Sequence, residues 1–263
     1  YEQPSESSWI DFLPPELVDR LGMPDDANLG FEAHARLFIE SDTPFWVAPG
    51  TASWNTIIGR NTNAAANLVD AAVVGARHGA RGYLVTDGGD NGHHQPLAVS
   101  LPSLVRAAVA AWSGGTADVE VGPVIDWILD AEAGTGALLD TVGSLGETLG
   151  ITAPNASPIF TALVDTSMPV FGELDPAAGA AANATLDTAI DAFTHRSPAG
   201  ERGGIIAQEM VAACSLARLG LRRLGGDEPS AADFDAALAA QRSAWLRSSR
   251  PGGLDDSIAK IRR

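Results

Sequence analysis

The residues best suited to chemistry lie in the polar segment 86–96, Thr-Asp-Gly-Gly-Asp-Asn-Gly-His-His-Gln-Pro. It contains two carboxylates, Asp87 and Asp90, and two imidazoles, His93 and His94. Glycines in such a segment allow sharp turns and a close approach of the backbone to a ligand. The aspartates could accept hydrogen bonds from sugar hydroxyls, ligate a cation or orient a histidine. The simpler alternative is a solvated turn that satisfies its own backbone.

A second polar segment, residues 49–55 (Pro-Gly-Thr-Ala-Ser-Trp-Asn), places an indole beside hydroxyl and amide groups. Apolar sugar faces stack on aromatic rings, while sugar hydroxyls need directional hydrogen-bond partners. Trp54, Asn55 and the nearby Trp46 are therefore candidates for sugar binding. The alternative is that the two indoles fill the hydrophobic core.

The elements that must position these segments are strands and helices in alternation. Apolar runs predict buried strands at residues 44–48 and 82–86. Helical periodicity predicts helices over residues 29–40, 63–78 and 101–112. This order is typical of parallel β/α units. Functional groups in such folds collect on the loops after the strands, so residues 49–60 and 87–100 are expected to share a site.

The second half of the chain shows helical patterns only. They predict helices near residues 120–130, 136–149, 157–166, 177–194, 204–224, 230–247 and 254–262. Asp227 and Ser230 are candidate N-caps for the helix that begins at residue 231. We therefore expect a β/α region over residues 1–113 and a helical region over residues 114–263.

Composition excludes several classes of partner. The chain of 263 residues carries 17 Lys and Arg against 33 Asp and Glu, a net charge of −16. It lacks the basic surface that nucleic acids and anionic membranes attract, and no apolar run reaches the ~20 residues of a membrane helix. The single cysteine, Cys214, excludes an internal disulfide and a cysteine-rich zinc site. We expect no cofactor, metal, nucleic-acid or membrane partner, and the cytoplasm is slightly favoured.

Three stretches carry a longer and more specific pattern. Residues 45–55 read Phe-Trp-Val-Ala-Pro-Gly-Thr-Ala-Ser-Trp-Asn, and residues 79–97 include Gly-Ala-Arg-Gly-Tyr-Leu-Val-Thr-Asp and Gly-Asp-Asn-Gly-His. Residues 245–257 begin with Trp-Leu-Arg and end with Gly-Gly-Leu-Asp-Asp-Ser. Together these stretches resemble a bacterial branch of glycoside hydrolase family 20, whose members are β-N-acetylhexosaminidases.

The resemblance implies an α/β fold, the C-terminal portion of a (β/α)8 TIM-type barrel followed by an α-helical region. Residues 44–48 and 82–86 would be barrel strands seven and eight. The implied reaction is hydrolysis of terminal β-linked N-acetylhexosamine residues by a substrate-assisted retaining mechanism. The partner would be an N-acetylhexosamine-containing saccharide. The implied substrate-binding residues are Trp46, Trp54, Asn55, Asp87, Asp90 and His93.

The family's catalytic Asp-Glu pair follows strand four, which this chain does not contain, so no catalytic residue is assigned. Residues 225–228, Gly-Gly-Asp-Glu, are superficially similar to that pair. They follow an amphipathic helix, however, and a helix C-cap plus the next N-cap explains them. Two tryptophans usual in the family's loop eight are replaced by Gly88 and His94. We therefore expect this chain alone to be inactive.

Two other functions compete with this reading. One is a non-catalytic sugar-binding or scaffold protein that kept the barrel loops. The other is a metal-dependent hydrolase that uses Asp87, Asp90, His93 and His94, although the helical half offers no convincing further ligand.

Overall fold

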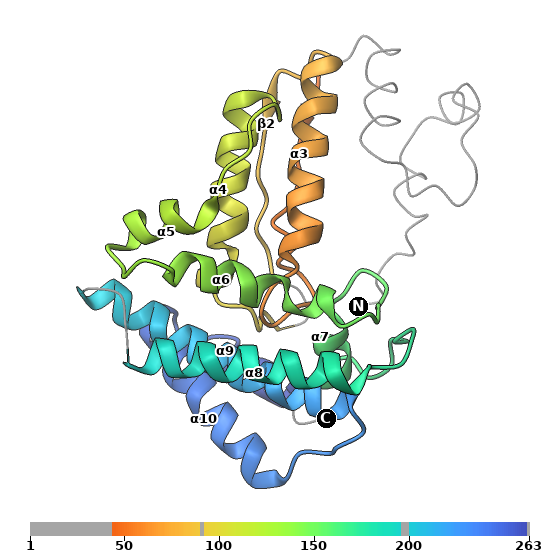
Figure 1. Cartoon of the computed structure of the whole chain (residues 1–263), viewed down its shortest axis with the longest axis vertical. Coiled ribbons are helices and arrows are strands. Elements are labelled where there is room, and N and C mark those ends of the chain that lie inside the picture. Colours follow the sequence, from red (N-terminus) through yellow and green to blue (C-terminus); the bar gives the residue numbers. More distant parts are fainter. Residues whose placement is uncertain (1–43, 90–91, 196–199, 262–263) are drawn as a thin grey trace.

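The computed structural model describes residues 44–89, 92–195 and 200–261. The helix predicted over residues 29–40 lies outside the described residues. The strands are β1 (Trp46–Val47) and β2 (Gly82–Tyr83). The helices are α3 (Asn61–Arg77), α4 (Leu97–Ser113), α5 (Val121–Leu129), α6 (Thr135–Ser144), the 3₁₀ turn η2 (Leu145–Thr148), α7 (Pro158–Leu163), α8 (Pro176–His195), α9 (Gly200–Leu224), α10 (Ala231–Ser248) and α11 (Leu254–Ile261). Figure 1 shows their arrangement.

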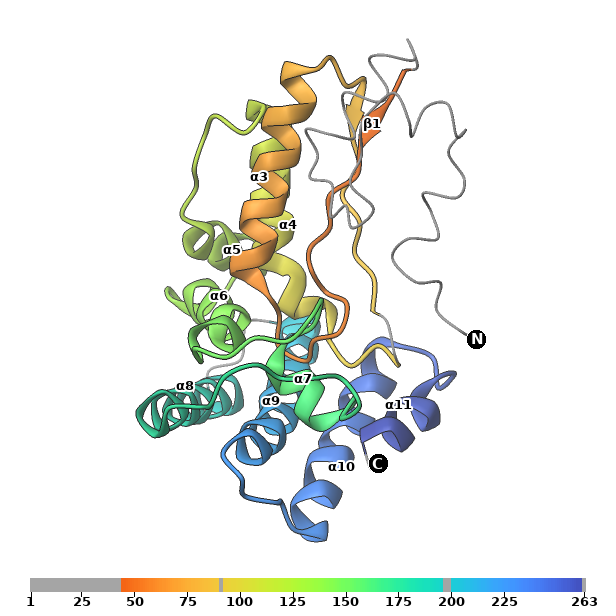
Figure 2. The ribbon, with the colours of Figure 1, turned by 90° about the vertical axis from the view of Figure 1, so that its right-hand side faces the viewer.

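The two strands pair in parallel, with Trp46 opposite Gly82 and Val47 opposite Tyr83. Helix α3 connects them, and α4 follows β2 and packs against α3 (Figures 1 and 2). The predicted order of strand, helix, strand and helix is therefore confirmed. The part of the chain that the structure describes is mostly helical, with this one parallel pair, and it does not show a barrel portion.

Both strands are shorter than the predicted runs. The Val47 carbonyl accepts from the Leu84 N–H, and the next bond of a regular parallel ladder would run from residue 49 to the Leu84 carbonyl. Residue 49 is proline, which has no N–H to donate. The chains nevertheless stay side by side, because the Thr86 N–H donates to Pro49 and the Thr51 N–H donates to Thr86, both at 2.9 Å.

The helical half agrees closely with its sequence pattern. All seven predicted helices are present, and the segment predicted over 136–149 divides into α6 and η2. Ser230 caps α10 in a capping box with Asp233, whereas Asp227 pairs with Arg222 instead of capping a helix. Cys214 is fully buried in α9.

Helix α9 is the centre of the lower layer, where it contacts α7, α8 and α10 (Figure 1). It is long and apolar enough to cross a membrane, but two thirds of its most apolar window is buried in the protein. Packing against three other helices accounts for that composition. Among the described residues no other helix meets the length and hydropathy of a span.

One hydrophobic core runs through most of the molecule. It includes Ile57 and Val99 from the first half and Phe160, Met210 and Ile261 from the second. The core thus crosses the expected boundary between residues 113 and 114, and the division into two domains stays a prediction.

An ion pair also joins α4 to α6. The Arg106 guanidinium of α4 donates to both oxygens of Asp140 on α6, at 2.8 and 2.7 Å. The Asn61 amide at the start of α3 donates to the same carboxylate at 3.1 Å. Burial acts to raise the pKa of Asp140, but the hydrogen bond and charge of Arg106 outweigh it, and the pKa lies below its usual value.

Candidate functional site

The loops after β1 and β2 leave the strand pair at the same end. Gly50 and Thr86 form a parallel bridge just beyond the strands, so residues 51–55 and 87–89 begin next to each other. We call these two segments the loop cluster. Their proximity follows from the parallel pairing, which places the carboxyl ends of both strands together.

Side-chain hydroxyls hold the loop cluster together. The Thr51 hydroxyl donates to the Asp87 carboxylate. Ser53 bonds the main chain of Gly88 twice, accepting from its N–H at 2.9 Å and donating to its carbonyl at 2.8 Å. Thr51 and Ser53 are buried, whereas Asp87 and Gly88 are exposed. The cluster therefore has a buried polar base and an exposed acidic surface.

Trp54 is fixed beside this base. A side chain on Gly50 would lie 2.6 Å from the ring of Trp54, so only glycine permits this close approach. The indole N–H donates to the Asn155 side chain at 2.7 Å. The Arg60 guanidinium lies over the ring, 5.0 Å from its centroid, in a cation–π contact. Trp54 is half-buried, with one ring face covered by Arg60.

Arg60 itself is unusual because it is buried. Burial lowers its pKa, and the charge of Glu147 partly opposes the change. Its Nε atom donates to the Ala52 carbonyl, but one terminal nitrogen has no hydrogen-bond partner in the described structure. The charge of the Arg60 guanidinium is therefore stabilised by the face of the Trp54 ring and by the negative charge of Glu147.

Backbone strain concentrates at the same place. Five described residues other than glycine have positive φ, and Ala52, Asn55, His93 and Asn155 are four of them, with φ between 45° and 54°. Such conformations persist only where surrounding contacts impose them, and they cluster at functional sites. The segment around Asn155 supplies part of the constraint, because the Ser157 N–H donates to the Asn55 carbonyl at 2.9 Å.

The expected site residues divide into groups. Trp54, Asn55 and Asp87 belong to the loop cluster, and Asp90 lies outside the described residues. Trp46 is at the other end of the strand pair, 62% exposed, with its ring over Gly82. The structure therefore does not bring Trp46 to the loop cluster.

His93 connects the loop cluster to a cavity. Its ring lies against Gly89 on one side and is edge-on to Trp245 of α10, with ring centroids 6.4 Å apart. The neighbouring His94 is buried, and its Nδ1 lies 3.0 Å from the Ser257 hydroxyl of α11. Both histidines line the cavity described next, and His94 also connects the loop to the last helix.

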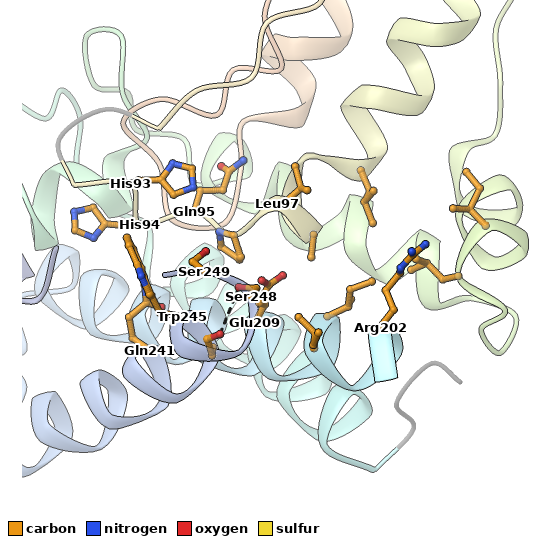
Figure 3. Close-up of a pocket in the computed structure, with 18 residues that line it drawn as sticks. His93, His94, Gln95, Leu97, Arg202, Glu209, Gln241, Trp245, Ser248 and Ser249 are labelled. Carbon is orange, nitrogen blue, oxygen red and sulfur yellow. Dashed lines mark hydrogen bonds between the residues drawn. The ribbon is translucent and has the colours of Figure 1, made fainter. Parts of the chain in front are cut away.

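The cavity has a volume of about 490 Å³ and lies between residues 93–101, the end of α5, the start of α9 and the end of α10 (Figure 3). Most of its lining surface is apolar, and Trp245 forms an aromatic wall. Polar groups from Glu209 and Gln241 also line it. Its size is typical of small-molecule sites.

Glu209 is the buried acid of this cavity. Burial raises its pKa, and hydrogen bonds from the Ser248 hydroxyl and the Ala98 N–H act in the opposite direction. Ala98 lies in the first turn of α4, whose N-cap residue Pro96 makes no side-chain cap. Glu209 therefore also accepts a hydrogen bond from the first turn of α4. That helix begins at Leu97, four residues before the predicted first residue, Leu101.

Sequence reasoning did not identify Glu209, Gln241, Trp245 or Arg60 as site residues. One signal for Glu209 was available, because it shares the apolar face of α9 with Ile206 and Ala213, where a charge is out of place. No comparable signal marks Gln241, since its environment depends on how α10 packs on α9.

Two further expectations concern metal and acid groups. Within the described residues, no three His, Cys, Asp or Glu side chains are grouped to hold a metal ion. Glu228, from the segment similar to the family's catalytic pair, is exposed and pairs with Arg223 at 2.7 Å. That contact belongs to the turn between α9 and α10, away from the loop cluster (Figure 1).

Comparison with known proteins identifies no family for this chain. No protein-family model matches the chain, and no curated protein matches it at a significant level. The resemblance to glycoside hydrolase family 20 therefore depends on the sequence stretches at residues 45–97 and 245–257.

Proposed function

We propose that the loop cluster binds the N-acetylhexosamine end of a saccharide, as part of a β-N-acetylhexosaminidase of the glycoside hydrolase family 20 type. The observation that carries this proposal is the joining of the two loops by Thr51–Asp87 and Ser53–Gly88 hydrogen bonds. Sugar sites need directional acceptors beside an aromatic surface. Asp87 supplies the exposed acceptor, and Trp54 lies in the same cluster.

The proposed roles of this chain's residues are binding and orientation. Thr51 engages the Asp87 carboxylate, and the remaining lone pairs of that carboxylate can accept from sugar hydroxyls. In the proposed reaction, the substrate's own acetamido group attacks the anomeric carbon and the configuration is retained. The acid that protonates the leaving group is not assigned to any residue of this chain.

The barrel portion is part of the same proposal. Parallel strands are normally covered on both faces. Residues 46 and 84 share one face of the strand pair, and their side chains, Trp46 and Leu84, are 62% and 54% exposed. An open apolar face supports the proposal that further strands of a (β/α)8 barrel cover it in the intact enzyme.

A non-catalytic sugar-binding protein is the second candidate. It is favoured by one observation, the Arg223 pairing of Glu228, which leaves the only segment similar to the catalytic pair in a turn between helices. Sugar binding without turnover would be its signature.

The test is calorimetric titration of the chain with N-acetylglucosamine and N-acetylgalactosamine, with glucose for comparison. We expect saturable binding of an N-acetylhexosamine, weakened about tenfold in Asp87→Asn, because losing a charge-assisted hydrogen bond costs about 1.5 kcal/mol. Asp70→Asn, an exposed aspartate on α3, is the matched control and should bind normally. Absence of binding, or equal affinity in Asp87→Asn, would contradict the proposal.

Catalysis is tested separately with an aryl N-acetylhexosaminide. We expect no turnover by this chain, since a general acid contributes roughly 10²–10⁴ in rate. Turnover that Glu228→Gln abolishes would instead assign the acid to the segment between α9 and α10.

A further inference from the structure

The cavity beside the loop cluster has walls suited to hydrocarbon. Leu97 and Ile128 at its edges are 59% and 48% exposed, although both are large and apolar. Ile205, Ile206 and Leu101 continue the aliphatic lining inward. Apolar side chains that line a cavity and remain in contact with water gain free energy when a ligand covers them.

One polar group of the cavity is a buried carboxyl group that has no ion-pair partner among the described residues. Glu209 is 8% exposed and makes no ion pair with any residue of the described structure. It accepts hydrogen bonds from Ser248 and Ala98, which occupy only part of its four acceptor positions. A buried carboxylate ordinarily requires a charged partner.

Gln241 is a second polar group on the wall of the cavity. Its residue is 7% exposed, and its side-chain amide makes no hydrogen bond within the described parts of the chain. Figure 3 shows Gln241 and Trp245 together on α10, on the same wall of the cavity. Because this amide lines the cavity and makes no hydrogen bond to a described residue, its acceptor oxygen is available to a ligand.

We propose that this cavity binds a small amphipathic amine, with the ammonium group at Glu209 and Gln241 and the hydrocarbon body along the aliphatic walls. Both polar groups accept hydrogen bonds, and an ammonium group has three to donate. A ligand carboxylate would meet the negative charge of Glu209 at close range. Among the described lining residues, the exposed Arg202, on the side of the cavity away from Gln241 and Trp245 (Figure 3), is the arginine that could attract such an anion instead.

The experiment titrates the chain at pH 7.5 with hexylamine, octylamine, octanol and octanoate by calorimetry. We expect one saturable site for octylamine, with affinity rising about fourfold for each methylene added to hexylamine. Octanol should bind at least tenfold more weakly than octylamine, and octanoate more weakly still. Unsaturable binding of octylamine, or octanoate binding as tightly as the amine, overturns the proposal.

Two variants test separately the contribution of the Glu209 charge and that of the apolar walls to binding. Glu209→Gln should bring the octylamine and octanol affinities within about twofold of each other, and Glu201→Gln, exposed at the start of the same helix, is its matched control. Ala244→Phe fills the cavity from α10 without removing a polar group, so it should abolish binding of every probe even if Glu209→Gln fails to fold. Unchanged octylamine binding in a folded Ala244→Phe variant places the ligand elsewhere and overturns the proposal.

This inference does not rest on the proposed sugar function. The amine titration contains no saccharide, and Asp87→Asn leaves the cavity lining intact. Failure of one titration therefore does not decide the other.

Discussion

The strand pair and the helical layer are stabilised in different ways. Buried contacts around the strands form small clusters, such as Phe45 and Val47 against Ala71 and Val74 of α3. The helical layer instead shares one extensive core centred on α9. The loop cluster, at the end of the strands, consequently depends on hydrogen bonds between hydroxyls and main chain, while the cavity depends on the packing of helices.

The largest expected effect tests this contrast in packing. Phe160→Ala should lower the free energy of unfolding by about 3–5 kcal/mol, because Phe160 is fully buried in the extensive core. Val47→Ala removes two carbons from a strand cluster and should cost about 2 kcal/mol. Urea denaturation of both variants measures the difference. Equal losses would mean that the strand cluster belongs energetically to the main core.

A smaller effect is expected at the ion pair that joins the two regions. Asp140→Asn should cost about 2 kcal/mol at pH 7, because it weakens a charge-assisted pair with Arg106. The pKa of Asp140 is lowered by folding, so its contribution is complete above the ordinary value of 3.8 and is lost as pH falls from there through the lower pKa of the folded state.

Stability curves of the wild type and Asp140→Asn from pH 7 to pH 3 give the measurement. The difference between the two curves should narrow toward the acidic end. A constant difference over the whole range would show that packing, and not the charge of Asp140, joins α4 to α6.

The smallest predicted effect concerns affinity at the loop cluster. A side chain at Gly88 would meet no atom within 4 Å, so Gly88→Trp is sterically allowed. An indole that covers about 55 Å² of apolar sugar surface would tighten N-acetylglucosamine binding about tenfold. Calorimetry measures the affinity, and thermal unfolding should be unchanged because the core is not touched. Weaker binding in the folded variant would mean that residue 88 does not face the sugar.

Much of the fold could be predicted from local patterns. Periodic apolar residues predicted the described helices of both halves, and the capping chemistry of Ser230 predicted the start of α10. The helix predicted over residues 29–40 stays a prediction. The strand lengths could not be inferred from hydrophobicity, because the interruption arises from the missing N–H of Pro49 in a pairing between distant segments. The barrel and the domain division remain predictions.

The candidate site could be predicted only for the residues that lie in the two loops directly after the strands. The loop cluster follows from two parallel strands and their polar loops. Its partners come from elsewhere in the chain: Asn155 is about a hundred residues from Trp54, and Glu209 reaches α4 from α9. Such contacts depend on how helices pack, which periodicity does not specify.

The contact between His94 and Ser257 has a consequence for the order of folding. The two residues are 163 positions apart and both are buried. Closing so long a loop is entropically costly, and contacts of high sequence separation form slowly. During synthesis, the polar segment after β2 leaves the ribosome long before α11 exists. The segment around His94 can therefore complete its native contacts only after translation reaches the end of α11.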